Sequence, residues 1–412
     1  MAFVEHLVGL GYRRLPPGPL VAADDDTTLF TSVAAPAWRR FLTGYPRSRP
    51  GGSVVLQWTV STSRLMHLPS GIPPSAHRTI GAIWVGRRPY REALGGVLEA
   101  LRKAHVGTGD LTFHLRAERH ESPSVTAALL ELGIRPEGIV RGARLPDGLV
   151  RLEPELGPCL SVRRRSGTAR FGHCDAQCPC GCHVTVAHIQ FAERYRTGGR
   201  ITPLRQPLSE IIVFEHALTP AVDIAGLPVQ GGRSIPVPAL LSRLTRAIAD
   251  LQPLAGNVTG RSPVLLADLA SVVVLLLGDG MAPGLRGGPY VLRRMMRMIG
   301  TELALQGLSP DLMSAVIATA DIAYRAPLGF PELPDRSWTY VEREQDAFQR
   351  VLTRGPDLLL RSGALSEDEG DAARQLARLW SERGVPLALS LRWCREAGVE
   401  PSLPHLARVE VE

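Results

Sequence analysis

The chain has 412 residues, of which 44% are apolar and 21% are charged, a balance that excludes a disordered chain and is ordinary for a globular protein. Its length favours two domains, each able to bury its own apolar core. The formal net charge of +7 is carried almost wholly by arginine, with Lys103 as the sole lysine, which favours a nucleotide or nucleic-acid partner unless it reflects codon bias alone.

The first half of the chain alternates short apolar runs with turns rich in proline and glycine. Runs rich in β-branched residues predict strands at Ser53–Val60, Leu111–Leu115 and Glu210–Phe214. Helical spacing predicts helices over Tyr90–His105 and Ser122–Leu132. This mixture predicts an α+β domain with a central sheet.

A connection rich in glycine and proline, Gly226–Pro238, separates this region from an entirely helical one. We place the domain boundary near residue 235, which gives domains over residues 1–235 and 236–412. Helical periodicity then predicts helices at Ala239–Leu251, Pro263–Gly278, Tyr290–Gln306, Asp311–Ala326, Trp338–Arg354, Ser366–Arg383 and Ser390–Gly398.

The sequence shows neither a membrane span nor a secretory signal. The longest apolar stretch, Leu265–Gly278, is shorter than the roughly 20 residues that a membrane span needs, so we expect a buried helix there. The residues Met1–His6 do not begin a secretory signal. We therefore expect a cytoplasmic protein without a membrane partner.

Four cysteines cluster within nine residues, and histidines flank them. In a cytoplasmic chain this arrangement suggests a structural zinc site before it suggests disulfides, although the one-residue spacings are tight for a zinc knuckle. Reduced thiols without a metal are the alternative. The four candidate ligands are Cys174, Cys178, Cys180 and Cys182.

Three ordered stretches resemble the alanyl-tRNA synthetase family. In Phe3–Gly44, the residues Thr27–Thr31 resemble the strand of its motif 1. In Gly157–Leu204, the turn Gly157–Cys159 and the cysteine-rich loop resemble family segments. The third stretch is the most specific: Ala267–Gly280 matches a family helix without a gap, and the YVLRR signature follows it.

The resemblance implies a class II synthetase-type catalytic domain with a mainly antiparallel sheet, followed by a helical tRNA-recognition domain. The signature YVLRR spans Tyr290–Arg294, and Phe330–Leu333 and Gly384–Leu387 resemble later elements of the same helical region. We expect only these two domains in the chain, without the family's editing and C-terminal domains. In the family, the activity is ATP-dependent ligation of alanine to tRNA.

The chain departs from the family where the aminoacyl adenylate is made. That reaction needs fixed cations around the phosphates, and class II enzymes supply an arginine in motif 2 and another in motif 3. The matching positions here are Ser61 and Ala217. The glycines that let ATP approach the backbone are replaced by Ile212 and Phe214, whose side chains would fill that space. We therefore doubt that ATP and Mg²⁺ bind.

Four residues are candidates for binding a small amino-acid-like ligand. Arg64 and Arg78 lie near motif 2 and could contact a phosphate, or they could be solvated loop residues. Glu210 takes the position of the aspartate that holds the amino group of alanine in the family, and it could also be a plain strand-edge carboxylate. His188 replaces an asparagine near the amino acid pocket, where a hydrogen-bonded core histidine is the more common finding.

The tRNA-recognition residues are altered too. Leu285 and Ser381 stand where the family has polar residues that recognise the acceptor stem, so small polar base readers are missing. An arginine cluster remains that could bind phosphates without reading sequence, or could pair with acids between helices. Its members are Arg286, Arg293, Arg294 and Arg297.

Three functions are compatible with these patterns. The first is a synthetase-like protein that no longer charges tRNA and instead binds tRNA, aminoacyl-tRNA, an amino-acid-like ligand or a protein partner. The second is a repurposed enzyme of a specialised pathway that activates an amino acid or forms an amide. The third, which the motif losses favour least, is a minimal alanine–tRNA ligase. No catalytic residue is assigned.

Overall fold

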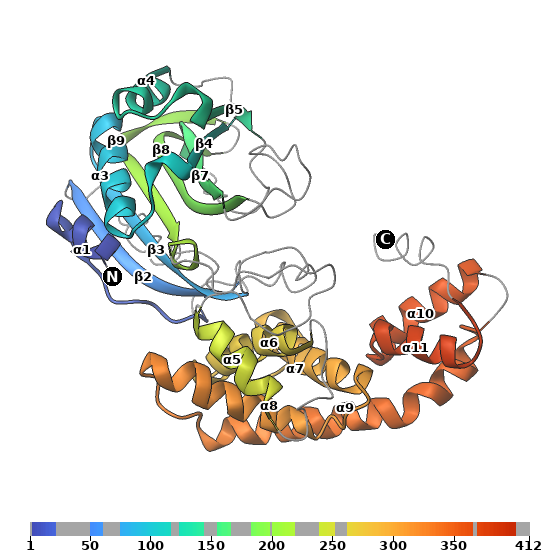
Figure 1. Ribbon diagram of the computed structural model, residues 1–412. Coiled ribbons are helices and arrows are strands. Elements are labelled where there is room, and N and C mark those ends of the chain that lie inside the picture. The colour runs from blue at the N-terminus through green and yellow to red at the C-terminus, as the bar shows by residue number, and fades with distance from the viewer. Residues whose placement is uncertain are drawn as a thin grey trace. The chain divides into compact units, whose positions relative to one another are not determined.

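The computed structural model describes residues 2–21, 50–60, 75–116, 123–143, 155–165, 183–197, 200–218, 239–251, 262–365 and 369–400. These residues form two compact units (Figure 1). Residues up to Leu218 belong to the first unit, and residues from Leu240 belong to the second. The predicted boundary at residue 235 lies outside the described residues.

The first unit is built around one mixed sheet. Its order is β1-β2-β3-β9-β8-β7-β4-β5, with β6 paired to β8. The predicted α+β fold and its three predicted strands are confirmed. The pairings β1–β2 and β4–β5 are parallel, and the other pairings are antiparallel. The elements are α1 (Ala2–Gly9), β1 (Tyr12–Arg14), β2 (Gly51–Val60), β3 (Ala76–Val85), α3 (Tyr90–Lys103), β4 (Leu111–Arg116), α4 (Pro123–Glu131), β5 (Ile139–Ala143), β6 (Glu155–Leu156), β7 (Cys159–Arg165), β8 (His183–Thr197) and β9 (Arg200–Phe214).

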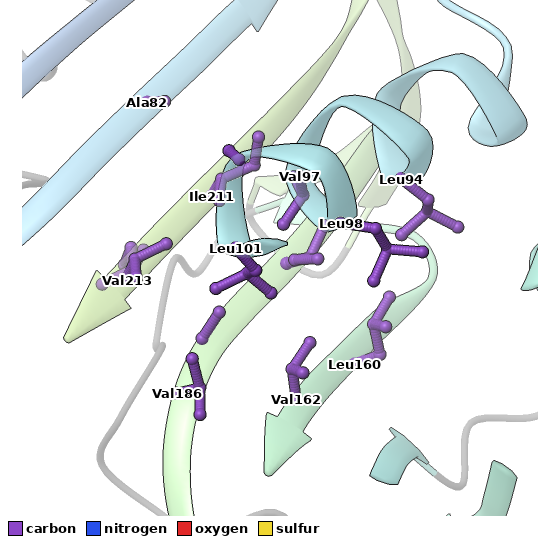
Figure 2. Close-up of a cluster of buried hydrophobic side chains, with 14 of the residues drawn as sticks. Ala82, Leu94, Val97, Leu98, Leu101, Leu160, Val162, Val186, Ile211 and Val213 are labelled. Atoms are coloured by element: carbon purple, nitrogen blue, oxygen red, sulfur yellow. The ribbon is translucent and has the colours of Figure 1, made fainter. Parts of the chain in front are cut away.

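Helix α3 covers one face of this sheet. Its leucines and valines recur at helical spacing, so a single stripe of α3 is apolar. This stripe packs onto β9, β8 and β7, where alternate side chains are apolar (Figure 2). The residues that meet in this layer include Leu94, Val97, Leu98 and Leu101 from α3 and Leu160, Val162, Ile211 and Val213 from the sheet.

The second unit is helical, as predicted. Its central helix, α6, is apolar on all sides and almost wholly buried against α7 and α8. The expectation of a buried helix in this stretch is therefore confirmed. Within the described ranges, no helix has the length and apolarity needed to cross a bilayer. The helices are α5 (Ala239–Ala249), α6 (Ser262–Gly278), α7 (Gly287–Leu305), α8 (Leu312–Ala320), α9 (Asp335–Ser362), α10 (Glu369–Arg383) and α11 (Leu387–Glu396).

A close approach between α9 and α11 depends on a glycine. A Cβ atom added to Gly355 in α9 would lie 2.3 Å from the indole of Trp393 in α11. Glycine normally weakens a helix interior relative to alanine, so its presence here reflects packing. Pro356 follows within the same helix.

We predict that Gly355→Ala lowers the free energy of unfolding by about 1–3 kcal/mol, because the Trp393 ring must move out of a packed interface. Gly9→Ala is the matched control, since no atom lies within 4 Å of the added Cβ at that helical position. Urea denaturation measures both changes. Equal midpoints for the two variants would show that the contact does not constrain the packing.

Candidate functional site

Strand alternation gives the sheet two chemically different faces. Residues two apart on one strand, and residues directly opposite each other on neighbouring strands, point to the same face. The face opposite α3 carries a set of buried polar side chains and is called the polar face below. Its polar members, each at most 9% exposed, are Gln57 and Thr59 (β2), His77 and Thr79 (β3), His114 (β4), Ser161 (β7), His188 and Gln190 (β8) and Glu210 (β9).

His188 lies in the interior of the polar face. It stands opposite Ser161, and its Nδ1 atom lies 2.7 Å from the serine hydroxyl oxygen. Its ring meets Phe214 edge-on, with the ring centroids 5.6 Å apart. With 3% of its surface exposed, His188 has the geometry of a hydrogen-bonded core histidine rather than that of a base open to solvent.

Glu210 places a carboxyl group in the middle of the polar face. The strand register sets it opposite Gln190 on β8 and Ile83 on β3, and it is 2% exposed. Water does not stabilise a carboxylate at such a position, whereas a nearby positive charge does. Glu210 is therefore an interior residue of the sheet and not a solvated carboxylate at a strand edge. Elsewhere on the same face, the Thr79 hydroxyl has no hydrogen-bond partner in the described part of the chain.

Apolar side chains also lie on the polar face, and two of them follow Glu210 on β9. Ile212 and Phe214 project from β9 onto it, opposite Gly81 and Thr79 of β3, and they are 1% and 3% exposed. Three imidazole rings surround Phe214, with centroid distances of 5.9, 5.6 and 5.8 Å for His77, His188 and His216. The space beside Gly81 is therefore filled by side chains of this protein.

Arg78 does not join the polar face. It lies within β3 next to Thr79, so its side chain points to the opposite face of the sheet. Its guanidinium forms a two-pronged ion pair with Glu215, one N–O distance being 2.6 Å, and lies 5.7 Å from the ring centroid of Trp58. Arg78 is therefore not a solvated loop residue, which was one of the two alternatives for it, because β3 begins at Ala76.

Arg163, which the sequence patterns did not single out, lies on the polar face. Arg163 lies two residues after Ser161 on β7, opposite Thr112 of β4. Burial lowers the pKa of its guanidinium. Because Ser161 and Arg163 are two residues apart on a strand, their spacing in the sequence could have indicated that they share a face. Ala217, at the motif 3 position, is buried in a short helical turn after β9.

In the second unit, three of the four clustered arginines make contacts between helices. The Nε atoms of Arg293 and Arg297 on α7 lie 3.1 and 3.3 Å from carboxylate oxygens of Glu344 on α9. Arg294 lies 5.6 Å from the ring centroid of Trp380 on α10. Arg286, in an extended conformation just before α7, is exposed. For Arg293 and Arg297, this geometry is the alternative in which the arginines pair with acids between helices.

The two positions at which the family has polar base readers are exposed and take no part in the ion pairs of Arg293 and Arg297. Leu285 is 78% exposed, and Ser381 on α10 is also exposed. Ser61 and Arg64 lie outside the described residues, as do the predicted zinc ligands Cys174, Cys178, Cys180 and Cys182. Among the residues that the structure does describe, no group of three or more histidine, cysteine or acidic side chains could hold a metal ion.

Comparison with known proteins relates the chain to alanine–tRNA ligases. The ligase of Mycolicibacterium vanbaalenii is 32% identical over 139 residues, which cover 32% of this chain and 15% of the relative. The ligase of Frankia alni is 23% identical over 437 residues, covering 96% of this chain and 46% of the relative. The chain thus spans about half the length of the curated relatives that it matches along its whole length. No family model matches it.

Solved structures show weaker similarity. The apo histidyl-tRNA synthetase of S. aureus has a TM-score of 0.33 and 11% identity, covering 52% of this chain and 62% of the other. A threonyl-tRNA synthetase structure from Cryptosporidium parvum has a TM-score of 0.33 and 12% identity, covering 51% and 59%.

We predict that Glu344→Gln destabilises the second unit by about 1–3 kcal/mol, because one carboxylate neutralises two largely buried guanidiniums. Thermal denaturation should show a lower Tm. Asp346→Asn on the same helix is the control, since Asp346 is exposed and makes no ion pair within the described residues. An unchanged Tm for Glu344→Gln would mean that Arg293 and Arg297 do not depend on this carboxylate.

Proposed function

The chain is a divergent relative of the alanine–tRNA ligases, and from this premise we propose that it binds tRNA or aminoacyl-tRNA without making an aminoacyl adenylate. The observation that carries the proposal is the filled position beside Gly81. In the family that the sequence resembles, glycines leave this part of β9 open to ATP. Here Ile212 and Phe214 occupy it, and both side chains are buried on the polar face.

The distribution of positive charge supports the same proposal. Adenylation requires cations fixed around the phosphates of ATP. Arg78, the described arginine nearest to the motif 2 position, points to the other face and is neutralised by Glu215. Ala217 supplies no charge at the motif 3 position. Arg163 is a cation on the polar face, but it lies on β7 and not on β3 or β9.

A small ligand with an ammonium group fits the remaining chemistry of the polar face. Glu210 holds a carboxyl group where the family holds the amino group of alanine, and Gln190 lies directly opposite it. A buried carboxylate stabilises a cation more strongly than a solvated one does. The amino acid end of an aminoacyl-tRNA carries such a group, so this chemistry supports aminoacyl-tRNA as a ligand of the polar face.

A repurposed amino-acid-activating or amide-forming enzyme is the second candidate. The observation that favours it is the retention of Glu210, His188 and Ser161 in one buried polar layer. Burying polar side chains costs free energy that apolar side chains would not cost. A protein that only binds a partner would have no need to keep these polar residues inside the sheet. Amino-acid-dependent exchange of pyrophosphate into ATP distinguishes this candidate, because only an activating enzyme catalyses the exchange.

The full chain should retard unfractionated tRNA in a native gel at low salt, with affinity that falls as salt rises, because the expected contacts are to phosphates. It should show no pyrophosphate exchange with any of the standard amino acids. Failure to retard tRNA at low salt would end the RNA-binding proposal, and exchange with any amino acid would support the second candidate instead.

A further inference from the structure

The second unit contains a groove lined by arginines that have no ion-pair partner among the described residues. It lies between α9 and α10 and has a volume of about 290 Å³. Arg361 of α9 and Arg378 and Arg383 of α10 line it, together with one acid, Glu382. None of these three arginines makes an ion pair or hydrogen bond within the part of the chain that the structure describes. Three guanidiniums beside a single carboxylate leave the groove with a positive charge.

A stripe of arginines leads along α9 to this groove. Positions 336, 343, 350, 354 and 361 are separated by seven, seven, four and seven residues. At about 100° per residue, these spacings place all five side chains within an arc of roughly 40° on the helix surface. The members of the stripe, all exposed, are Arg336, Arg343, Arg350, Arg354 and Arg361.

The stripe faces away from the core of its unit. Val341, Phe348 and Leu359 are the buried side of α9, and the arginines lie on the opposite side of the helix. Asp346 and Asp357 flank the stripe on one side only, and neither forms an ion pair with it among the described residues. The stripe and the groove together, which we call the arginine track, extend for about 38 Å along the helix axis, at about 1.5 Å of rise per residue.

We infer that the arginine track binds the phosphate backbone of RNA without reading its sequence; the inference rests on the proposed function and gives it a site. Repeated guanidiniums without acidic partners among the described residues can pair with a row of phosphates. Because the positive charges lie in a line along α9, they match the line of negative charges on a polynucleotide strand. The track is separate from the cluster at Arg293 and Arg297, whose charge Glu344 already balances in part.

An anionic membrane is a poorer fit for this surface. Helices that lie in a membrane surface insert an apolar face beside their basic face. The apolar face of α9 is committed to its own unit, where Phe348 and Val341 are fully buried. The track therefore offers positive charge and hydrogen-bond donors, but few apolar side chains that could insert into a membrane. This is the composition of a surface that binds phosphates from solution.

The test compares two triple variants of the full chain by filter binding to tRNA across a series of salt concentrations. The first is Arg350→Gln, Arg354→Gln and Arg361→Gln in the track. The second removes three exposed arginines of the first unit that also lack ion pairs in the described chain: Arg87→Gln, Arg135→Gln and Arg141→Gln. Both variants lose the same charge, and glutamine keeps the helix propensity of α9.

The track variant should bind tRNA at least tenfold more weakly at low salt, and the slope of log K against log salt should fall by about 2–3, since each phosphate contact contributes about 0.7–0.9. The control variant should keep most of the affinity and the slope. An RNA duplex of unrelated sequence should compete with tRNA for the wild type, because phosphate contacts carry no sequence information.

Each other outcome has a distinct meaning. Equal losses in the two variants would overturn the inference and leave only a general effect of charge. A wild type that binds tRNA with a track variant of unchanged slope would overturn the inference while the proposed function stands. A wild type that binds no tRNA would overturn both. Loss of binding to phosphatidylserine vesicles, with tRNA binding unchanged, would assign the track to membranes and overturn the RNA inference.

Discussion

The packing of α3 against the central sheet determines which residues of the first unit can form a site. Because strand neighbours alternate between faces, the apolar layer under α3 fixes the direction of the side chains in the regularly paired parts of β3, β8 and β9. Ile211 and Val213 pack toward α3, so Glu210, Ile212 and Phe214 must point the other way. The same rule that gathers the polar face also brings Ile212 and Phe214 onto it.

The same constraint determines which side chains lie on the polar face of a chain that resembles the alanine–tRNA ligases. The strand framework survives, and with it a buried carboxyl group and an imidazole hydrogen-bonded to a serine hydroxyl. Ala217, Ile212 and Phe214 stand where the resemblance to the family leads us to expect an arginine and two glycines. Bulky residues on β9 add apolar contacts to the sheet, so they favour the stability of the fold.

The helical unit divides its arginines into two roles. Those on α7 hold helices together: Arg293 and Arg297 share Glu344, and Arg294 packs on Trp380. Those on the outer side of α9 make no ion pair within the described residues and face away from the core. Charge balance therefore separates structural arginines from arginines that are available to a partner, which net charge alone cannot do.

Much of the fold follows from periodicity along the sequence. The helical spacing of Leu94, Val97 and Leu101 and the continuous apolar run of α6 predicted elements that the structure confirms. The site was harder to predict because burial and pairing are tertiary properties. Alternating polar residues such as His188 and Gln190 normally indicate a solvated face, and here they are buried. Nothing in the sequence around Arg293 indicates that Glu344, 51 residues later, is its partner.

The central claim is that side chains of the protein occupy the place of ATP on the polar face. Calorimetric titration of the full chain with ATP and Mg²⁺, alone and with alanine present, tests it most directly. We predict no binding heat up to millimolar nucleotide, because opening the site would require Ile212 and Phe214 to leave a packed layer. Saturable binding with a stoichiometry near one, and a further gain in affinity with alanine, would contradict the account.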